Sequence, residues 1–288
     1  MLDCNYLGHQ ARYSLRDLSH EEIPTGVIFG FLSRVISLGN LFKTNEILFC
    51  WDSKHSHRKK IFPGYKSKRG KDRTPAEQRE FQSAMDQFKE LRLRILPRIG
   101  FRNVFVQAGI EADDLIAKIC MSGLSDFIVI SADHDLYQLL YPNVRIFNPS
   151  SKKMMTHSRF RDEYGLDPAH WSRVKAIGGC TSDSIPGVQG VGEKGAVDYL
   201  RGKLKPGKKR DKILSSQDLI DATERLTKLP FLKTKEIVVR RDSFDLVALD
   251  SICSELGFES LDLGAWEHFF RSEFEEPKER TVKVRRRM

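Results

Sequence analysis

Residues 103–136 read NVFVQAGIEADDLIAKICMSGLSDFIVISADHDL, and this stretch decides the fold. Apolar runs with β-branched residues at 103–106 and 127–131 flank a helical stretch at 112–121. Another such run, at 47–51, precedes a polar loop and further helical sequence. Short strands that alternate with helices are typical of an α/β domain with a mostly parallel sheet. We therefore predict that architecture for roughly the first half of the chain.

Acidic residues recur where these strands end and helices begin, and ligands of open α/β sheets bind at the carboxyl ends of strands. Mg²⁺ and Mn²⁺ prefer carboxylate oxygens, and carboxylates packed together repel one another unless cations neutralise them. Capping of a helix N-terminus explains a single acid, but it does not explain why acids recur at the ends of several strands. The candidate metal ligands are Asp3, Asp52, Glu111, Asp113, Asp114, Asp133, Asp135 and Asp183.

A basic segment at 54–73 contains the aromatic residues Phe62 and Tyr65. Cations that bind phosphates and aromatics that stack on bases favour nucleic acid, and a solvated basic loop is an equally weighted alternative. If the segment is helical, Lys66 and Arg69 lie one turn apart and can face one phosphate. The net charge of +9 also favours a polyanionic partner.

The 288 residues suffice for one large or two modest domains. The five cysteines lie far apart without a CxxC pair, which favours a reducing cytoplasm over a disulfide framework. No apolar run is long enough to cross a bilayer, and no signal peptide is visible.

The strand pattern disappears after about residue 172, where helical stretches are joined by a glycine turn, GVQGVGEK, at 187–194. Glycines let a backbone approach closely, and a helix start presents N–H groups to a phosphate. A tight turn between two helices is the plainer explanation. The candidate DNA-binding residues here are Gly187, Gly190, Gly192 and Lys194.

Six ordered motifs together resemble the flap endonuclease and 5′–3′ exonuclease superfamily, including the nuclease domain of bacterial DNA polymerase I and stand-alone phage exonucleases. The resemblance runs from Asp3 to about residue 200 and more weakly to about 265. The motifs are LDCNYLGHQAR at 2–12, PTGVIFGFL at 24–32, FCWDSKHSHRKKIFPGYKSKR at 49–69, GIEADDLIA at 109–117, ISADHDLYQLL at 130–140 and SDSIPGVQGVGEKGA at 182–196.

The resemblance implies a PIN-like α/β core with a mostly parallel sheet flanked by helices, a helical arch and a C-terminal helix-three-turn-helix subdomain that binds DNA. It implies two Mg²⁺ or Mn²⁺ ions. Asp52, Glu111 and Asp113 surround the first, with Asp3 and Asp114 nearby, and Asp133, Asp135 and Asp183 surround the second.

The same resemblance gives roles to the basic residues. Lys66 and Arg69, with Arg58 behind them, position and polarise the scissile phosphate. Tyr65 stacks on a base, and Lys60 contributes to DNA binding. The turn at 187–192 holds a K⁺ ion against a duplex phosphate.

The chain departs from the family pattern at Cys180 and near its start. The family has an aspartate where Cys180 stands, and a thiolate suits Mg²⁺ poorly. Cys180 is either a bystander, which we favour, or a ligand for Mn²⁺ or Zn²⁺. Only Met1 and Leu2 precede Asp3, so the first strand is either abbreviated or begins upstream of this sequence.

We expect a nuclease core at 1–172 that includes the basic arch at about 54–96, a helix-three-turn-helix and helical region at 173–270, and a basic flexible tail at 271–288. The predicted function is metal-dependent hydrolysis at 5′ ends, flaps or RNA primers of duplex DNA. The alternative is a flap- or junction-binding protein that Cys180 has left catalytically weak. A PIN-type ribonuclease shares the core but does not explain the glycine turn.

The expected partners are DNA with a 5′ flap or a single-strand to double-strand junction, or an RNA–DNA hybrid. A polymerase or a single-strand-binding protein is a candidate protein partner. We expect a monomer that acts in the cytoplasm, or in the host cytoplasm if a phage encodes it, without membrane contact.

Overall fold

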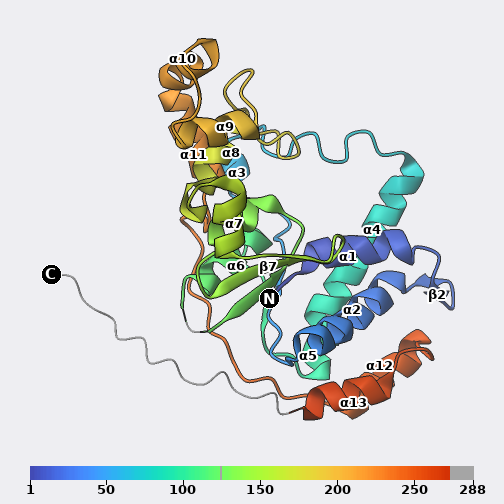
Figure 1. Ribbon diagram of the computed structural model, residues 1–288. Helices are drawn as coiled ribbons and strands as arrows, with labels where there is room; N and C mark the ends of the chain where they lie inside the picture. Colours follow the sequence, from blue (N-terminus) through green and yellow to red (C-terminus); the bar gives the residue numbers. More distant parts are fainter. Residues whose placement is uncertain (124, 273–288) are drawn as a thin grey trace.

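A six-stranded sheet with the order β5-β4-β1-β6-β7-β8 forms the centre of the computed structural model, which describes residues 1–123 and 125–272 (Figure 1). Every neighbouring pair is parallel except β7 and β8. The strands are β1 (Leu2–Asp3), β4 (Phe49–Cys50), β5 (Val104–Phe105), β6 (Phe127–Ile130), β7 (Val144–Asn148) and β8 (Lys153–Met155). The predicted mostly parallel sheet is confirmed, although β7 and β8 were not predicted.

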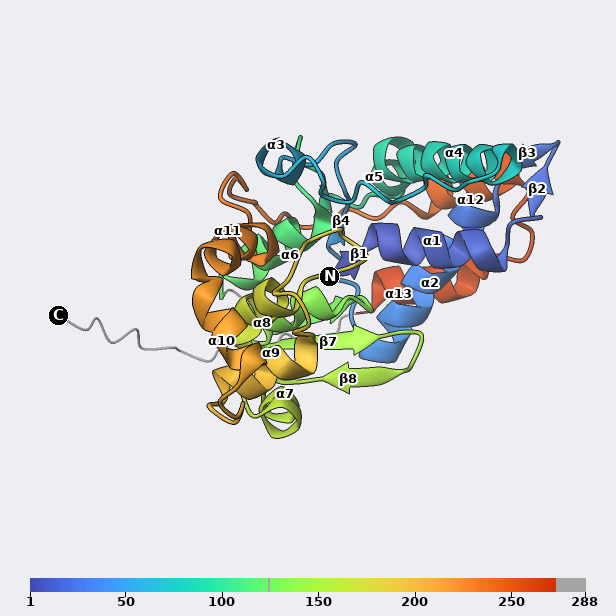
Figure 2. The same cartoon turned by 90° about the horizontal axis from the view of Figure 1, so that it is seen from above.

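Each face of the sheet has its own hydrophobic core, because successive side chains of a strand point to opposite faces. Val129 and Ile146 pack into one core, whereas their neighbours Ile130 and Phe147 pack into the other. The first core is covered by α6 (Ala112–Cys120), α7 (His157–Tyr164), α8 (Trp171–Gly178) and α9 (Glu193–Leu200) (Figure 2). The second is covered by α1 (Cys4–Ser14), α2 (Gly26–Phe42), α4 (Pro75–Glu90) and α5 (Leu96–Ile99).

The basic segment connects the two sides of the molecule above the carboxyl ends of the strands (Figure 1). It contains one short helix, α3 (Arg58–Ile61), and then turns without helix as far as Thr74. Thr74 caps α4 and forms a capping box with Glu77, which fixes where the helix begins. The expectation of a basic helix around Lys66 is therefore wrong in this structure, since Lys66 itself has a left-handed backbone with φ of 51°.

The helices after α9 divide between the two sides of the sheet. The pair α10 (Lys208–Ser215) and α11 (Gln217–Thr227) joins the core around α8 and α9. The chain then crosses the edge of β5, where the side chains of Asn103 and Gln107 bond to the backbone of residues 235 and 240. It then forms α12 (Leu246–Leu256) and α13 (Leu263–Arg271), which pack with α2 and α5.

A small hairpin joins α1 to α2 and consists of β2 (Ser19–His20) and β3 (Ile23–Pro24). The tail predicted at 271–288 lies outside the described residues, except for Arg271 and Ser272. Within the described part of the chain, no helix combines the length and apolar character needed to cross a bilayer.

Candidate active site

The acidic side chains gather at the carboxyl ends of the strands, because β4, β1 and β6 are parallel neighbours and these ends lie side by side. Asp3 ends β1 and caps α1. Asp52 and Asp133 follow β4 and β6 in the same way. Glu111 is the N-cap residue of α6, and Asp113 lies in its first turn. The topology thus brings these acids together at the carboxyl ends of the strands.

Among the described residues, four of the acids act on one another and form no ion pair with a cation: Asp3, Asp52, Asp113 and Asp133. Burial and then the charge of Asp52 raise the pKa of Asp3 to about 7. Burial and then the charge of Asp133 raise the pKa of Asp113 well above its ordinary value. This mutual repulsion is what a bound divalent cation relieves.

The side chains of Asp135, Cys180 and Asp183 form a second group, which we call the mixed-donor group. One ligand atom from each lies within 4.8 Å of the other two. Asp135 follows β6, whereas Cys180 and Asp183 lie in the loop after α8. Burial and then the charge of Asp133 raise the pKa of Asp135, so this group adjoins the first four acids.

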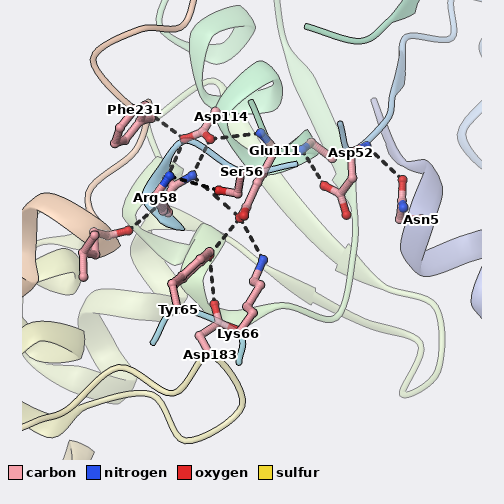
Figure 3. A network of polar contacts seen from close by, with 12 residues as sticks. Asn5, Asp52, Ser56, Arg58, Tyr65, Lys66, Glu111, Asp114, Asp183 and Phe231 are labelled. Carbon is pink, nitrogen blue, oxygen red and sulfur yellow. Dashed lines mark hydrogen bonds and ion pairs between the residues drawn. The ribbon is translucent and has the colours of Figure 1, made fainter. Parts of the chain in front are cut away.

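The basic segment contacts three of the acids, Glu111, Asp114 and Asp183 (Figure 3). Lys66 Nζ donates to Glu111 Oε2 at 2.8 Å, and Arg69 Nη2 donates to Asp183 Oδ1 at 2.6 Å. The backbone N–H of Lys66 also donates to the carbonyl of Asp183 at 2.7 Å. Burial opposes ionisation of Glu111, but the charges of Lys66 and Arg58 outweigh it and lower its pKa to about 2. Glu111 is therefore ionised and neutralised by side chains of the protein itself.

Arg58 and Asp114 form a buried ion pair that corrects two predictions. The Arg58 guanidinium donates to both carboxylate oxygens of Asp114, at 2.6 and 2.7 Å (Figure 3). Arg58 Nε donates to the carbonyl of Leu226, and the N–H of Phe231 donates to Asp114. Arg58 is 2% exposed and Asp114 is 0% exposed. As placed, Arg58 has no surface to offer DNA, and Asp114 is engaged by arginine rather than free to bind a metal.

Tyr65 also differs from its predicted role. Its side chain is 3% exposed, and its hydroxyl donates to Glu111 Oε2 at 2.8 Å, with Asp183 Oδ2 3.3 Å away. A ring buried in this way cannot stack on a base, so Tyr65 instead lies between Glu111 and Asp183. Lys60 is exposed on α3, as its predicted contact with DNA requires.

The glycine turn joins α8 to α9, as predicted, but its glycines are needed for different reasons. A Cβ atom on Gly187 would lie 2.4 Å from the backbone nitrogen of Gly179, so close packing of two backbones demands glycine there. Gly190 has open space around it and a φ of 80°, which favours glycine through conformation alone. Gly192 is the N-cap residue of α9, and Lys194 is exposed in the first turn of that helix.

Lys175 is a site residue that the sequence did not suggest. Its Nζ lies 3.1 Å from Asp135 Oδ1 and 3.2 Å from Glu193 Oε2. The Oδ1 atom of Asp135 is buried and still lacks a hydrogen bond of good geometry, despite this ion pair. A single lysine on a helical stretch carries no sequence signal for such a contact. An unsatisfied buried carboxylate oxygen beside other carboxylates fits a divalent cation.

Comparisons with known proteins show which family this chain resembles. A family model described as "5'-3' exonuclease, N-terminal resolvase-like domain" matches residues 1–165. A 5′-3′ exonuclease of Buchnera aphidicola subsp. Schizaphis graminum is 28% identical over 236 residues, which are 80% of this chain and 75% of that protein. DNA polymerase I of Mycobacterium leprae is 31% identical over 211 residues, which are 69% of this chain but only 22% of the polymerase.

Among solved structures, T5 5′-exonuclease with bound zinc ions aligns with a TM-score of 0.68 at 22% identity, covering 93% of this chain and 95% of that one. A likeness at this identity establishes the PIN-like, resolvase-like fold. The family model covers more than half of the chain, so family membership does not depend on that likeness. This chain is a nuclease that belongs to the superfamily of 5′–3′ exonucleases and flap endonucleases.

Proposed function

We propose that this nuclease hydrolyses phosphodiesters of DNA at 5′ ends, 5′ flaps or RNA primers, close to a single-strand to double-strand junction. The observation that carries the proposal is the basic segment lying across a carboxylate centre at the carboxyl edge of the sheet. Such a centre suits divalent cations, and a basic cover suits the phosphate of a nucleic acid.

We assign two divalent ions to the centre, Mg²⁺ or Mn²⁺. When bound, two such ions activate water and stabilise the leaving oxygen of phosphoryl transfer. Asp52, Glu111 and Asp113, with Asp3 nearby, would hold the first ion. Asp133, Asp135 and Asp183 would hold the second. The oxygen-rich donor set and the unrelieved repulsion among its carboxylates support this assignment.

Lys66 and Arg69 are the proposed phosphate-positioning residues. Their cationic groups lie beside Glu111 and Asp183, so they are close to a phosphate bound to the proposed metal ions. Arg69 is half-exposed, so it can turn from Asp183 to an incoming phosphate at little cost. Lys66 is more buried and would move with the backbone turn that carries it.

Duplex DNA would bind along the glycine turn at 187–192 and the start of α9. Gly190 and Gly192 leave their backbone open to a phosphate, and Lys194 adds a nearby positive charge. We propose K⁺ as the cation that links this turn to the phosphate. Solved structures with the same fold include the catalytic core of Rad2 in complex with a DNA substrate, with a TM-score of 0.57.

We further propose a monomer that acts in the cytoplasm, alone or in concert with a polymerase or a single-strand-binding protein. All five cysteines are free thiols, which accords with a reducing compartment.

The test is cleavage of a 5′-flap duplex by purified protein with Mg²⁺ or Mn²⁺. Asp133→Ala should lower the rate at least about 100-fold, because it removes a proposed ligand of the second ion. Asp126→Ala is the matched control, since Asp126 is an exposed acid at the opposite end of the same strand. Native protein that leaves the flap intact, or an Asp133→Ala variant as fast as the control, would overturn the proposal.

A further inference from the structure

The mixed-donor group has a composition unlike that of the other acids in the cleft. It offers two carboxylates and one thiol within 4.8 Å of one another. Hard ions such as Mg²⁺ bind oxygen ligands, whereas Zn²⁺ and Co²⁺, and to a lesser degree Mn²⁺, accept sulfur. The identity of the third donor therefore changes which ion the group prefers.

The position of Cys180 in this group is fixed by its backbone. Its N–H donates to the carbonyl of Ile185 at 3.0 Å, and the N–H of Ile185 donates back at 2.9 Å. Cys180 thus forms an antiparallel bridge that closes the loop carrying Asp183. Rotation about one side-chain bond is the main freedom left to the sulfur, which now lies 3.1 Å from Ser182 Oγ.

The charges around the group also work against a hard ion. Lys175 lies beside Asp135, and Arg69 lies beside Asp183, so each carboxylate already has a cation of the protein near it. A neutral thiol adds no negative charge, whereas a thiolate adds one. An ion that binds sulfur can displace the thiol proton and is then held by the negative charge and the strong donor atom of a thiolate. Mg²⁺ binds sulfur poorly and does not obtain this additional ligand.

We propose that Cys180 is a direct ligand of the second divalent ion, and that this sulfur shifts the site from Mg²⁺ toward Mn²⁺, Co²⁺ or Zn²⁺. As the metal–sulfur bond forms, the thiol proton passes to solvent and the ion loses one water molecule. The inference rests on the proposed two-ion nuclease, and it names the metal preference of that same site.

The test uses a spectroscopic signal that cleavage does not influence. Cobalt bound by a thiolate gives a near-ultraviolet sulfur-to-metal charge-transfer band, which oxygen ligands alone do not give. We expect this band on titrating the full chain with Co²⁺, and its loss in Cys180→Ser and Cys180→Asp. Cys253→Ser is the matched control, because Cys253 is buried in α12 away from the cleft and should keep the band.

Thiol alkylation gives a second readout on the native protein. Cys180 is half-buried and the other four cysteines are buried, so iodoacetamide should modify one thiol per chain. Zn²⁺ or Co²⁺ should slow this reaction at least about tenfold, a range typical of contacts that control metal affinity, while Mg²⁺ should not.

The outcomes separate this inference from the proposed function. If flaps are cleaved but the charge-transfer band and the protection are both missing, Cys180 is a bystander and the inference fails while the nuclease stands. A band that disappears in Cys180→Ser, together with no cleavage by the native protein, supports the metal site and overturns the proposed substrate. In Cys180→Asp, the ratio of Mn²⁺-supported to Mg²⁺-supported cleavage should fall at least about tenfold, and an unchanged ratio contradicts the inference.

Discussion

Seven of the eight candidate acids fall into two groups that share the carboxyl end of the sheet but differ in their partners. The eighth, Asp135, has Lys175 Nζ 3.1 Å away. Glu111, Asp114 and Asp183 each have a lysine or arginine nitrogen within 2.8 Å. Asp3, Asp52, Asp113 and Asp133 have one another instead. The pKa values follow this division: that of Glu111 is lowered to about 2, whereas that of Asp3 is raised to about 7.

The difference teaches which acids the protein neutralises with its own cations and which acids repel one another in the metal-free state. The paired acids tie the basic segment and the chain around Phe231 to the core. The unpaired acids repel one another in the metal-free folded protein, and a bound cation would relieve this repulsion. A fold-stabilising role and a metal-binding role thus divide between two adjacent residues that look alike in the sequence, Asp114 and Asp113. Glu111 and Asp183 would exchange the cations of Lys66 and Arg69 for a metal ion.

The adjacent pair Asp113 and Asp114 gives the sharpest test of this division. Asp114→Ala should lower the free energy of unfolding by about 3–5 kcal/mol, because it leaves the Arg58 guanidinium buried without its partner. Asp113→Ala should leave metal-free stability unchanged or higher, because it removes one of several repelling carboxylates. Urea denaturation at pH 7 in the presence of EDTA measures both. Equal losses in the two variants would mean that the division is wrong.

The pH dependence of stability should differ between the two groups. Asp3 has a raised pKa, about 7 against an ordinary 3.8, so the folded state binds this proton more tightly than the unfolded state does. Its contribution to stability should therefore fall as pH rises from about 4 to 7, with a total of about 1–3 kcal/mol. Glu111 has a lowered pKa, so its contribution should rise between about pH 2 and 4.5.

Thermal unfolding of the metal-free protein between pH 4.5 and 7.5 excludes Glu111, which is ionised throughout that window. Because the pKa values of Asp52 and Asp113 are also raised, the difference between the native chain and Asp3→Asn measures the Asp3 contribution. Asp3→Asn should flatten the profile, and saturating Mn²⁺ should flatten it in the native chain by favouring the ionised carboxylates. A native profile that rises through this window and does not respond to Asp3→Asn would contradict the assignment.

Much of the site was predictable from sequence because it depends on topology. Once strands and helices alternate, acids after successive strands must meet at one edge, and Asp52, Asp113 and Asp133 do so. The short strands were harder to locate: β7 was missed, although it is the longest strand described. Its sequence, VRIFN, contains one charged residue and ends in asparagine, and it directly follows a proline–asparagine turn. The apolar pattern that indicates a strand is therefore weak.

The pairings within the site were not predictable because they depend on side-chain packing between distant segments. Nothing local to Arg58 indicates that Asp114, 56 residues away, will bury it. Tyr65 lies in a basic run that suggests an exposed surface, yet the turn at Lys66 folds its ring inward. The family resemblance supplied roles for both residues, and the structure reassigns them to stabilising the metal-free cleft.

The exposed member of the paired group should show the smallest effect on stability. The pair between Arg69 and Asp183 is short, 2.6 Å, but the Arg69 side chain is half-exposed. Arg69→Ala should therefore cost less than about 1 kcal/mol of unfolding free energy.

If Arg69 positions phosphate, the same variant should lower flap cleavage at least about tenfold and weaken the salt dependence of DNA binding. Arg271→Ala, which also breaks an exposed ion pair, is the control that should leave cleavage unchanged. A large loss of stability in Arg69→Ala would mean that Arg69, like Arg58, stabilises the fold. Loss of cleavage without loss of stability would mean that Arg69 acts on the phosphate of the substrate.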